Sequence, residues 1–188
     1  HLYVYTFNSI YWIRRIDQAT GIPRINLATD FINMPLNISN IAICPSGKHV
    51  YVSSGNRIIW LERDFATGQL KAASSNNYTE VSGSMFNIMT ISPNGRKLYV
   101  ADMGPPLLSM FSINENTGAL SGYSPQVTSS STQIVVSNDG VNLYSADSLK
   151  NLVSWYTLDS GTGSILYGQG FGGSFLNSPF CVVVTQDG

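Results

Sequence analysis

The chain has 188 residues, enough for one domain with a hydrophobic core. Charged residues make up only 11% of it, and ten basic and eleven acidic side chains leave a net charge of −1. No cluster of basic residues is present to bind nucleic acid, and no apolar run approaches the roughly 18 residues of a membrane span. The hydroxyl-rich composition predicts an extracellular or cell-surface location. The chain begins at His1 rather than Met, which favours a mature product or a piece of a longer protein.

The segment His1-Leu2-Tyr3-Val4 predicts a strand with no strand before it, residues 10–16 the next strand, and Thr20-Gly21 a turn. One pattern then runs through the chain three times. It consists of an apolar strand, a tight turn with glycine, an apolar-Tyr strand, a loop, a third strand and a Thr-Gly turn. Its copies occupy residues 41–43, 45–47, 50–52, 58–61 and 67–68; then 88–91, 93–95, 98–100, 107–113 and 117–118; then 134–136, 138–140, 143–145, 152–158 and 162–163.

A last apolar segment, residues 181–185, leads into a fourth glycine turn at residues 186–188. The four turn glycines, Gly47, Gly95, Gly140 and Gly188, are 48, 45 and 48 residues apart. Repeats of this length typically form one four-stranded antiparallel sheet each, and no long segment has the apolar period of a helix. The sequence therefore predicts an all-β fold, a β-propeller of about four four-stranded antiparallel blades.

The blades are expected at residues 181–188 together with 1–36, then 37–84, 85–130 and 131–180. In this arrangement the C-terminal strand pairs with the N-terminal strand and closes the ring, which removes two exposed sheet edges. The repeat equally fits a segment of a larger propeller, or half of a ring that a second copy completes.

Ser92-Pro93-Asn94-Gly95, followed after two residues by Leu98-Tyr99-Val100-Ala101-Asp102, resembles the lactonase-type, YVTN-like β-propeller repeat. Residues 111–120 resemble the second half of that repeat, and four degenerate copies extend over the whole chain. The resemblance implies a propeller fold and, as chemistry, sugar-lactone hydrolysis or lactone formation. Because the repeat encodes blade packing, it identifies no functional residue.

Lactone chemistry needs a general acid or base, or a metal that activates water. The weak catalytic candidates are Asp102 and Asp147, which follow their apolar-Tyr strands at equivalent positions, and His49 beside a hairpin turn. Aspartates at such positions often bond the local backbone, and His49 is expected to face solvent. No catalytic motif or metal-binding cluster is recognised, so neither a cofactor nor a metal is expected.

Two features of the sequence could bind or carry sugars. Trp12, Trp60 and Trp155 lie in third strands, where aromatic rings can bind glycans but more often pack between blades. Asn37 and Asn77 begin glycosylation sequons and are expected at exposed positions between blades.

The two cysteines, Cys44 and Cys181, fall on first strands at positions that differ by about four residues along the strand direction. At about 3.3 Å per residue this offset is roughly 13 Å, whereas a disulfide needs Cα atoms within about 7 Å. We expect two free, buried thiols.

Because no catalytic constellation is recognised, the sequence favours an extracellular structural or interaction module, a building block of a larger surface or filamentous assembly. Its partners would be other copies of itself, other proteins, or glycans. The alternative is a lactonase-like hydrolase acting on a sugar lactone, and the second alternative is a carbohydrate-binding propeller.

Overall fold

The computed structural model describes residues 1–13, 15–16, 23–24, 30–34, 37–72, 76–82, 84–102, 108–127, 131–172 and 175–185. These residues form strands, turns and loops, with no helix among them. The described part of the chain accordingly holds no helix of the length and hydropathy that a bilayer crossing requires. The predicted all-β class is confirmed.

The strands are short, and most are joined by tight turns. They are β1 (Leu2–Tyr5), β2 (Ser9–Ile13), β3 (Arg15–Ile16), β4 (Pro23–Arg24), β5 (Phe31–Asn33), β6 (Asn40–Ile43), β7 (His49–Ser54), β8 (Arg57–Arg63), β9 (Leu70–Ala72), β10 (Tyr78–Glu80), β11 (Phe86–Ile91), β12 (Lys97–Asp102), β13 (Leu108–Ile113), β14 (Leu120–Val127), β15 (Gln133–Val136), β16 (Asn142–Asp147), β17 (Leu152–Leu158) and β18 (Ile165–Gly172).

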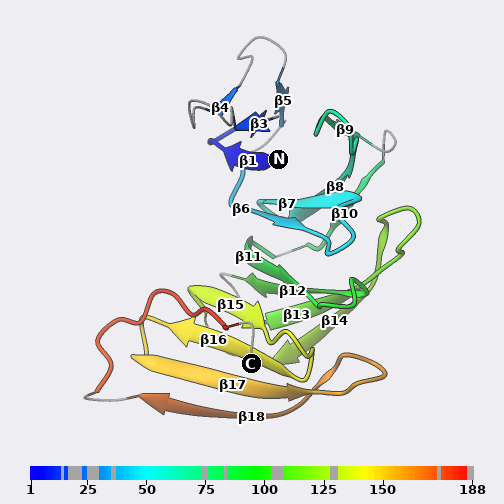
Figure 1. Ribbon diagram of the computed structural model, residues 1–188. Coiled ribbons are helices and arrows are strands. Elements are labelled where there is room, and N and C mark those ends of the chain that lie inside the picture. The colour runs from blue at the N-terminus through cyan, green and yellow to red at the C-terminus, as the bar shows by residue number, and fades with distance from the viewer. Residues whose placement is uncertain are drawn as a thin grey trace.

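Four antiparallel sheets follow one another along the chain and in space (Figure 1). Sheet I has the order β1-β2-β5, and sheet II the order β6-β7-β8-β10, with β9 also paired to β8. Sheet III is β11-β12-β13-β14 and sheet IV is β15-β16-β17-β18, while β3 and β4 form a small separate ribbon. The first strands β6, β11 and β15 contact one another from sheet to sheet. This succession of blade-like sheets confirms the predicted propeller architecture.

The repeated tyrosine has the same position in every sheet. It faces a tryptophan of the third strand, except in sheet III, where a methionine takes that place. The pairs are Tyr3–Trp12, Tyr51–Trp60, Tyr99–Met110 and Tyr144–Trp155. The sequence repeat is therefore also a structural repeat.

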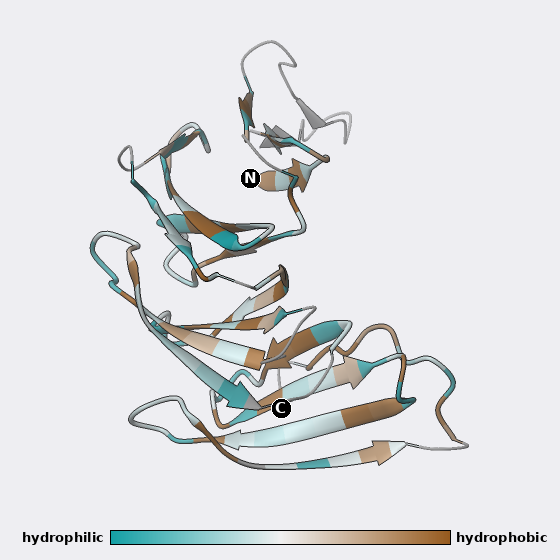
Figure 2. Ribbon diagram, turned by 180° about the vertical axis from the view of Figure 1, so that it is seen from behind, coloured by the Kyte–Doolittle hydropathy of each residue, from teal (hydrophilic) through white to brown (hydrophobic). Residues whose placement is uncertain are grey.

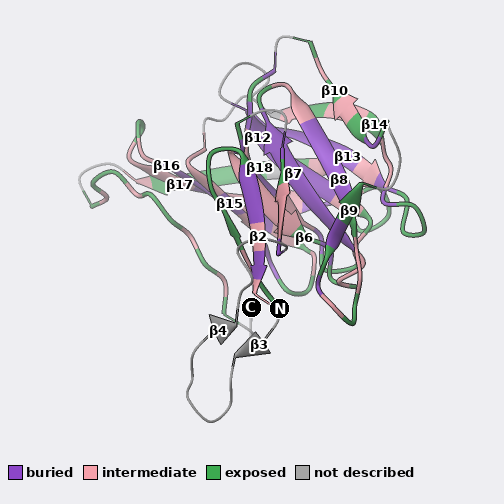
Figure 3. Cartoon of the chain, turned by 90° about the horizontal axis from the view of Figure 1, so that it is seen from above, coloured by how far each residue is buried: buried purple, intermediate pink, exposed green. Residues whose placement is uncertain are grey.

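The hydrophobic core lies between consecutive sheets. Because side chains alternate along a strand, each sheet presents its tyrosine face to the next sheet and its opposite face to the previous one. Tyr51 and Trp60 of sheet II thus pack with Leu98 and Phe111 of sheet III. Hydrophobic positions are concentrated in the strands (Figure 2), and the middle strands β7, β8, β12 and β13 are the most deeply buried (Figure 3).

The ring is not closed within the chain. Among the described residues, β1 pairs with β2 alone, and residues 181–185 form no strand. Sheets I and IV lie at opposite ends of the array (Figure 1), because three inter-sheet packings turn it too little to bring these ends together. The expected pairing of the terminal segments is therefore not found.

Candidate functional site

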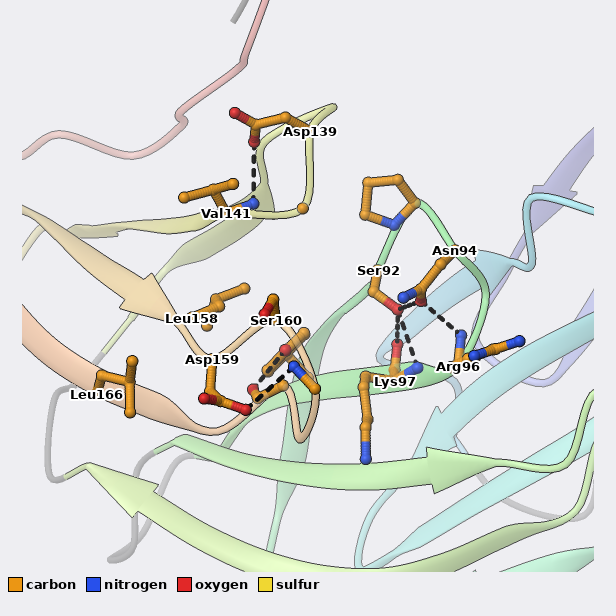
Figure 4. Close-up of a pocket in the computed structure, with 15 residues that line it drawn as sticks. Ser92, Asn94, Arg96, Lys97, Asp139, Val141, Leu158, Asp159, Ser160 and Leu166 are labelled. Carbon is orange, nitrogen blue, oxygen red and sulfur yellow. Dashed lines mark hydrogen bonds between the residues drawn. The ribbon is translucent and has the colours of Figure 1, made fainter.

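A cavity of about 500 Å³ lies between sheets III and IV, at the end of the sheets that carries the glycine turns (Figure 4). Three turns and the strands next to them enclose it. The lining residues are Ser92, Pro93, Asn94, Arg96, Lys97 and Tyr99 from sheet III, and Asp139, Gly140, Val141, Leu158, Asp159, Ser160, Gly161, Gly163 and Leu166 from sheet IV. Most of them are turn residues, held by hydrogen bonds within their own turn.

The glycine turn that follows the first strand is built alike in sheets III and IV, but with different side chains. In sheet III, Ser92 Oγ donates a 2.7 Å hydrogen bond to Asn94 Oδ1. In sheet IV, Ser137 Oγ donates one of 2.5 Å to Asp139 Oδ1, and the Val141 amide adds one of 2.9 Å. These bonds, the one from Ser137 first, hold the pKa of Asp139 below its usual range.

The Thr-Gly turn of sheet IV is capped by Asp159. Its Oδ1 accepts hydrogen bonds from Thr162, 2.6 Å from the amide and 2.8 Å from the hydroxyl. Both bonds favour the ionised carboxylate, so the pKa of Asp159 lies below its usual range. Asn114 caps the corresponding turn of sheet III, with its Oδ1 3.1 Å from the Thr117 amide. A carboxylate is therefore not needed to form this turn.

Two cations come from the first residues after the turn of sheet III. Lys97 Nζ donates a 3.0 Å hydrogen bond to Ser112 Oγ. Arg96 Nε lies 2.6 Å from Glu115 Oε1, in a pair whose side chains are 69% and 53% exposed. An ion pair this exposed contributes little to stability, so little free energy is needed to separate Arg96 from Glu115.

Beside Lys97, the Tyr99 hydroxyl lies at the buried wall of the cavity and donates a 2.7 Å hydrogen bond to the Gly163 carbonyl oxygen. Burial raises the pKa of Tyr99 to about 12. The hydroxyl therefore stays protonated at neutral pH and acts as a donor.

The cavity thus combines anionic and cationic groups around a space large enough for a small polar molecule. Asp139 and Asp159 each use Oδ1 in their turn, and no hydrogen-bond partner of either Oδ2 is found within the described residues. Lowered pKa values make both carboxylates poor bases but permanent acceptors for hydroxyl groups. A cation on the opposite wall can polarise a carbonyl oxygen.

The predicted catalytic aspartates lie elsewhere. Asp102 and Asp147 end β12 and β16, about 16 Å along the strand from the turn at which each strand begins. Asp102 Oδ1 accepts a 2.7 Å bond from the Met85 amide, and Asp147 Oδ1 accepts one of 2.9 Å from the Lys150 amide. Both carboxylates are buried among local backbone groups, and neither is brought to the cavity.

His49 does not face solvent, because the Thr-Gly turn of the next sheet covers it. Its side chain is buried against Gly118, where a β-carbon would stand 2.6 Å from the imidazole Cδ2. Burial, with the nearby charge of Lys48, lowers the pKa of His49. The expectation of a solvent-facing position was wrong.

The asparagines of the two predicted sequons and the two cysteines differ in how far they are exposed to solvent. Asn37 is exposed, whereas Asn77 is buried and its Nδ2 donates a hydrogen bond to the Trp60 carbonyl oxygen, which contradicts its expected exposure. Both cysteines are free, with Cys44 buried. Cys181 is exposed rather than buried, because its segment pairs with no strand.

The carboxylates of the cavity were not among the residues predicted from the sequence, although a comparison of the repeats distinguishes them. The residue before the turn glycine is Ser46, Asn94 and Asp139 in sheets II, III and IV. The residue three before the turn threonine is aspartate in sheets II and IV and Asn114 in sheet III. Among sheets II, III and IV, it is sheet IV that carries carboxylates at both positions. No group of three or more His, Cys, Asp or Glu side chains suited to a metal ion occurs in the described part of the chain.

Comparison with known proteins supports the fold and assigns a family. Residues 11–171 match the family model described as the SMP-30/gluconolactonase/LRE-like region. A search among curated proteins gives no match.

Among solved structures, the chain is similar to the periplasmic gluconolactonase of Pseudomonas aeruginosa, with a TM-score of 0.73 and 14% identity over 92% of this chain and 49% of that one. It is also similar to candidate 6-phosphogluconolactonases from Bacteroides uniformis (TM-score 0.69, 20% identity, 93% and 51% covered) and Bacteroides fragilis (0.70, 18%, 93% and 51%). The chain therefore spans about half the length of these structures.

The family match also corrects the functional interpretation favoured above. A structural building block of a surface or filamentous assembly was the wrong reading, because the matching model is named for gluconolactonase and covers most of the chain. The lactonase-like alternative agrees with that match. The chain belongs to the SMP-30/gluconolactonase/LRE-like family.

Proposed function

We propose that this chain is part of a lactonase-type hydrolase that opens the ring of a sugar lactone. Its family membership supports the class of reaction. The proposal rests on one observation. Sheet IV has Asp139 and Asp159 at the two turn positions where sheet III has asparagines. Both carboxylates line the same cavity as Lys97.

In lactone hydrolysis, the oxygen of water bonds to the carbonyl carbon, and the carbonyl oxygen becomes negatively charged. The ring C–O bond then breaks, the leaving oxygen takes up a proton, and a hydroxy acid is formed. In the cavity, Lys97 or Arg96 would stabilise the developing oxyanion, since a positioned cation lowers the energy of that state. The two carboxylates would accept hydrogen bonds from the sugar hydroxyls and from the attacking water.

The low pKa values give these carboxylates a positioning role more than a proton-accepting one. An acid with a pKa well below the working pH is a weak general base. Lactones are reactive esters, so orientation of water and stabilisation of the oxyanion supply most of the rate enhancement needed.

The test mixes the protein that contains this chain with each of a panel of aldonolactones. The acid released by hydrolysis is measured by pH-stat titration. Asp139→Asn and Asp159→Asn should each lower kcat/KM at least about tenfold. Both variants should fold, because Asn94 and Asn114 make the same turns in sheet III.

Asp64→Asn is the matched control. Asp64 caps the Thr-Gly turn of sheet II through the same bonds to Thr67, but it does not line the cavity. Its loss should leave turnover unchanged. Absence of lactone turnover above the uncatalysed rate, or full activity in both cavity variants, would refute the proposed function.

A further inference from the structure

Apolar side chains lie beside the two carboxylates in the sheet IV wall of the cavity. Val141 follows the glycine turn, Leu158 ends β17 and Leu166 is the second residue of β18. All three line the cavity, and Figure 4 shows them on its sheet IV side, across from Arg96 and Lys97 of sheet III. We call these three residues the apolar patch. One wall of the cavity thus supplies cations, and the other supplies carboxylates together with an apolar surface.

The fold of the turns does not require apolar residues at these three positions. The positions are the residue after the turn glycine, the residue before the one that caps the Thr-Gly turn, and the third residue after the glycine of the Thr-Gly turn. In sheet III the equivalent residues are Arg96, Ile113 and Ser121. In sheet II all three are cations, and they help to line a cavity of about 290 Å³ of their own: Lys48, Arg63 and Lys71. The apolar patch is therefore a property of sheet IV rather than of the repeat.

Water reaches two members of the apolar patch. Val141 and Leu166 are 46% and 64% exposed, whereas Leu158 is buried in the core between sheets III and IV. Apolar surface that a ligand removes from water contributes to the affinity for that ligand. A hydroxyl group placed on the same surface would lose hydrogen bonds to water and gain no partner there. The patch thus favours a carbon substituent over a polar one.

We propose that the lactone accepted by this cavity carries an apolar carbon substituent, such as the terminal methyl group of a 6-deoxyaldonolactone. This inference rests on the lactonase function proposed above and names the substrate class of the same site. The cavity, of about 500 Å³, has room for a six-carbon lactone.

The chemistry of the ring places such a substituent at the apolar patch. In a 1,4-lactone, the ring oxygen is bonded to the carbonyl carbon C1 and to C4, and C4 carries the rest of the sugar chain. When the carbonyl oxygen lies at the cations of sheet III, this chain extends toward the opposite wall. The hydroxyl groups then meet Asp139 and Asp159, and the terminal methyl group covers Val141 and Leu166.

Two pairs of lactones that differ in one group test the preference. L-Rhamnono-1,4-lactone and L-mannono-1,4-lactone are identical except that the first ends in a methyl group and the second in a hydroxymethyl group. L-Fucono-1,4-lactone and L-galactono-1,4-lactone form a second such pair with other ring configurations. We expect kcat/KM to be at least about fourfold higher for the methyl compound of each pair, which is the effect of burying one carbon group.

The Val141→Thr/Leu166→Ser double variant makes the exposed part of the patch polar. Threonine has nearly the shape of valine, and sheet III carries Ser121 at the position of Leu166. The ratio of the two kcat/KM values should fall toward one, whereas general damage to the fold would lower both values alike and keep their ratio. Leu149→Ser is the matched control, because this side chain is 87% exposed and does not line the cavity. Its ratio should equal that of the unchanged protein.

Binding of the corresponding lactams separates this inference from the proposed function. In these compounds N–H replaces the ring oxygen, so they resist hydrolysis, and titration calorimetry should show about fourfold tighter binding of the methyl compound. Equal kcat/KM values within both lactone pairs, or an unchanged ratio in the double variant, would overturn the inference and leave the lactonase function standing. Absence of lactone turnover with the lactam preference intact would refute the lactonase function and still support the apolar preference of the cavity. Absence of both would overturn both.

Discussion

The hydroxyl of Tyr99 in sheet III donates a 2.7 Å hydrogen bond to the carbonyl oxygen of Gly163 in sheet IV, 64 residues later in the chain. The same bond joins Tyr51 to Gly118 and Tyr3 to Gly68, at 3.0 and 2.7 Å. In sheets I, II and III, the tyrosine of the repeat therefore links its sheet to the Thr-Gly turn of the next sheet. The two most regular features of the sequence meet at this contact.

Removal of one such link should destabilise the fold without disturbing its shape. Tyr99→Phe keeps the buried ring but leaves the Gly163 carbonyl without this donor, which should cost about 1–2 kcal/mol in the free energy of unfolding. Urea denaturation followed by tryptophan fluorescence measures the change. Tyr78→Phe, at a 40% exposed side chain, is the control and should lie within about 0.5 kcal/mol of the unchanged protein. Equal stability of both variants would show that the link contributes nothing.

The cost of replacing a glycine by alanine should depend on whether a neighbouring side chain packs against it, as a comparison of Gly118 with Gly55 can show. Gly118 and Gly55 both have positive φ angles, 74° and 59°, so alanine is strained at either position. A β-carbon on Gly118 would also lie 2.6 Å from the His49 ring. A β-carbon on Gly55 would have no atom of the surrounding structure within 4 Å. We expect Gly55→Ala to cost about 1 kcal/mol and Gly118→Ala clearly more. Similar thermal shifts for both variants would contradict the packing of His49.

The repeat made the architecture predictable because its residues serve packing at every position. The apolar-Tyr strands form where the sequence predicts them, and so do the glycine turns of residues 45–47, 93–95 and 138–140 and the Thr-Gly turns of residues 67–68, 117–118 and 162–163. The turns predicted at Thr20-Gly21 and at residues 186–188 lie outside the described residues. Closure of the ring was not predictable, because it depends on the small rotation from each sheet to the next. No single residue encodes that rotation.

The candidate site was less visible than the fold. Asp102 and Asp147 attract attention because they stand at equivalent strand ends, yet they hold local backbone there. Asp139 and Asp159 resemble ordinary turn residues, and only the three-dimensional packing of sheet III on sheet IV places them around one cavity. The burial of two side chains was equally hidden, since the Thr-Gly turn of sheet III covers His49 and Asn77 is bonded to Trp60 within its own sheet.

Asn77 should be a structural residue and Asn37 should not. The buried side chain of Asn77 bonds the Trp60 carbonyl oxygen, while its own carbonyl accepts a 3.0 Å bond from the Trp60 amide. Asn77→Ala should therefore cost about 1–3 kcal/mol, because a buried acceptor loses its partner. Asn37→Ala, at an exposed side chain, should be nearly neutral. Chemical denaturation of the two variants side by side checks this order, and a neutral Asn77→Ala would contradict it.

Acid should weaken the turns of sheets II and IV. The pKa values of Asp64, Asp139 and Asp159 are lowered by hydrogen bonds within their turns. A lowered pKa stabilises the fold above the unfolded value of about 3.9, and this stabilisation is lost as the pH falls through the lower, folded value. The contribution of these three carboxylates to the melting temperature should thus be constant above about pH 5 and be lost below about pH 4. In the Asp64→Asn/Asp159→Asn double variant, calorimetry should show a smaller fall. An unchanged acid slope would indicate that these bonds do not favour the ionised state.

His49 should give the fold a second pH dependence, nearer neutrality. Its pKa is lowered, mainly by burial and further by Lys48, although Glu62 on the facing strand acts in the opposite direction. The neutral ring is therefore favoured in the folded state, so stability is full above the unfolded pKa of about 6.5 and declines as the pH falls below it. His49→Asn introduces the residue that sheet IV carries at the equivalent position, Asn142, and removes this titration. The urea midpoint of the unchanged chain should fall between about pH 7.5 and 5.5, whereas that of the variant should change less. Parallel pH profiles for the two proteins would mean that His49 titrates as freely when folded as when unfolded.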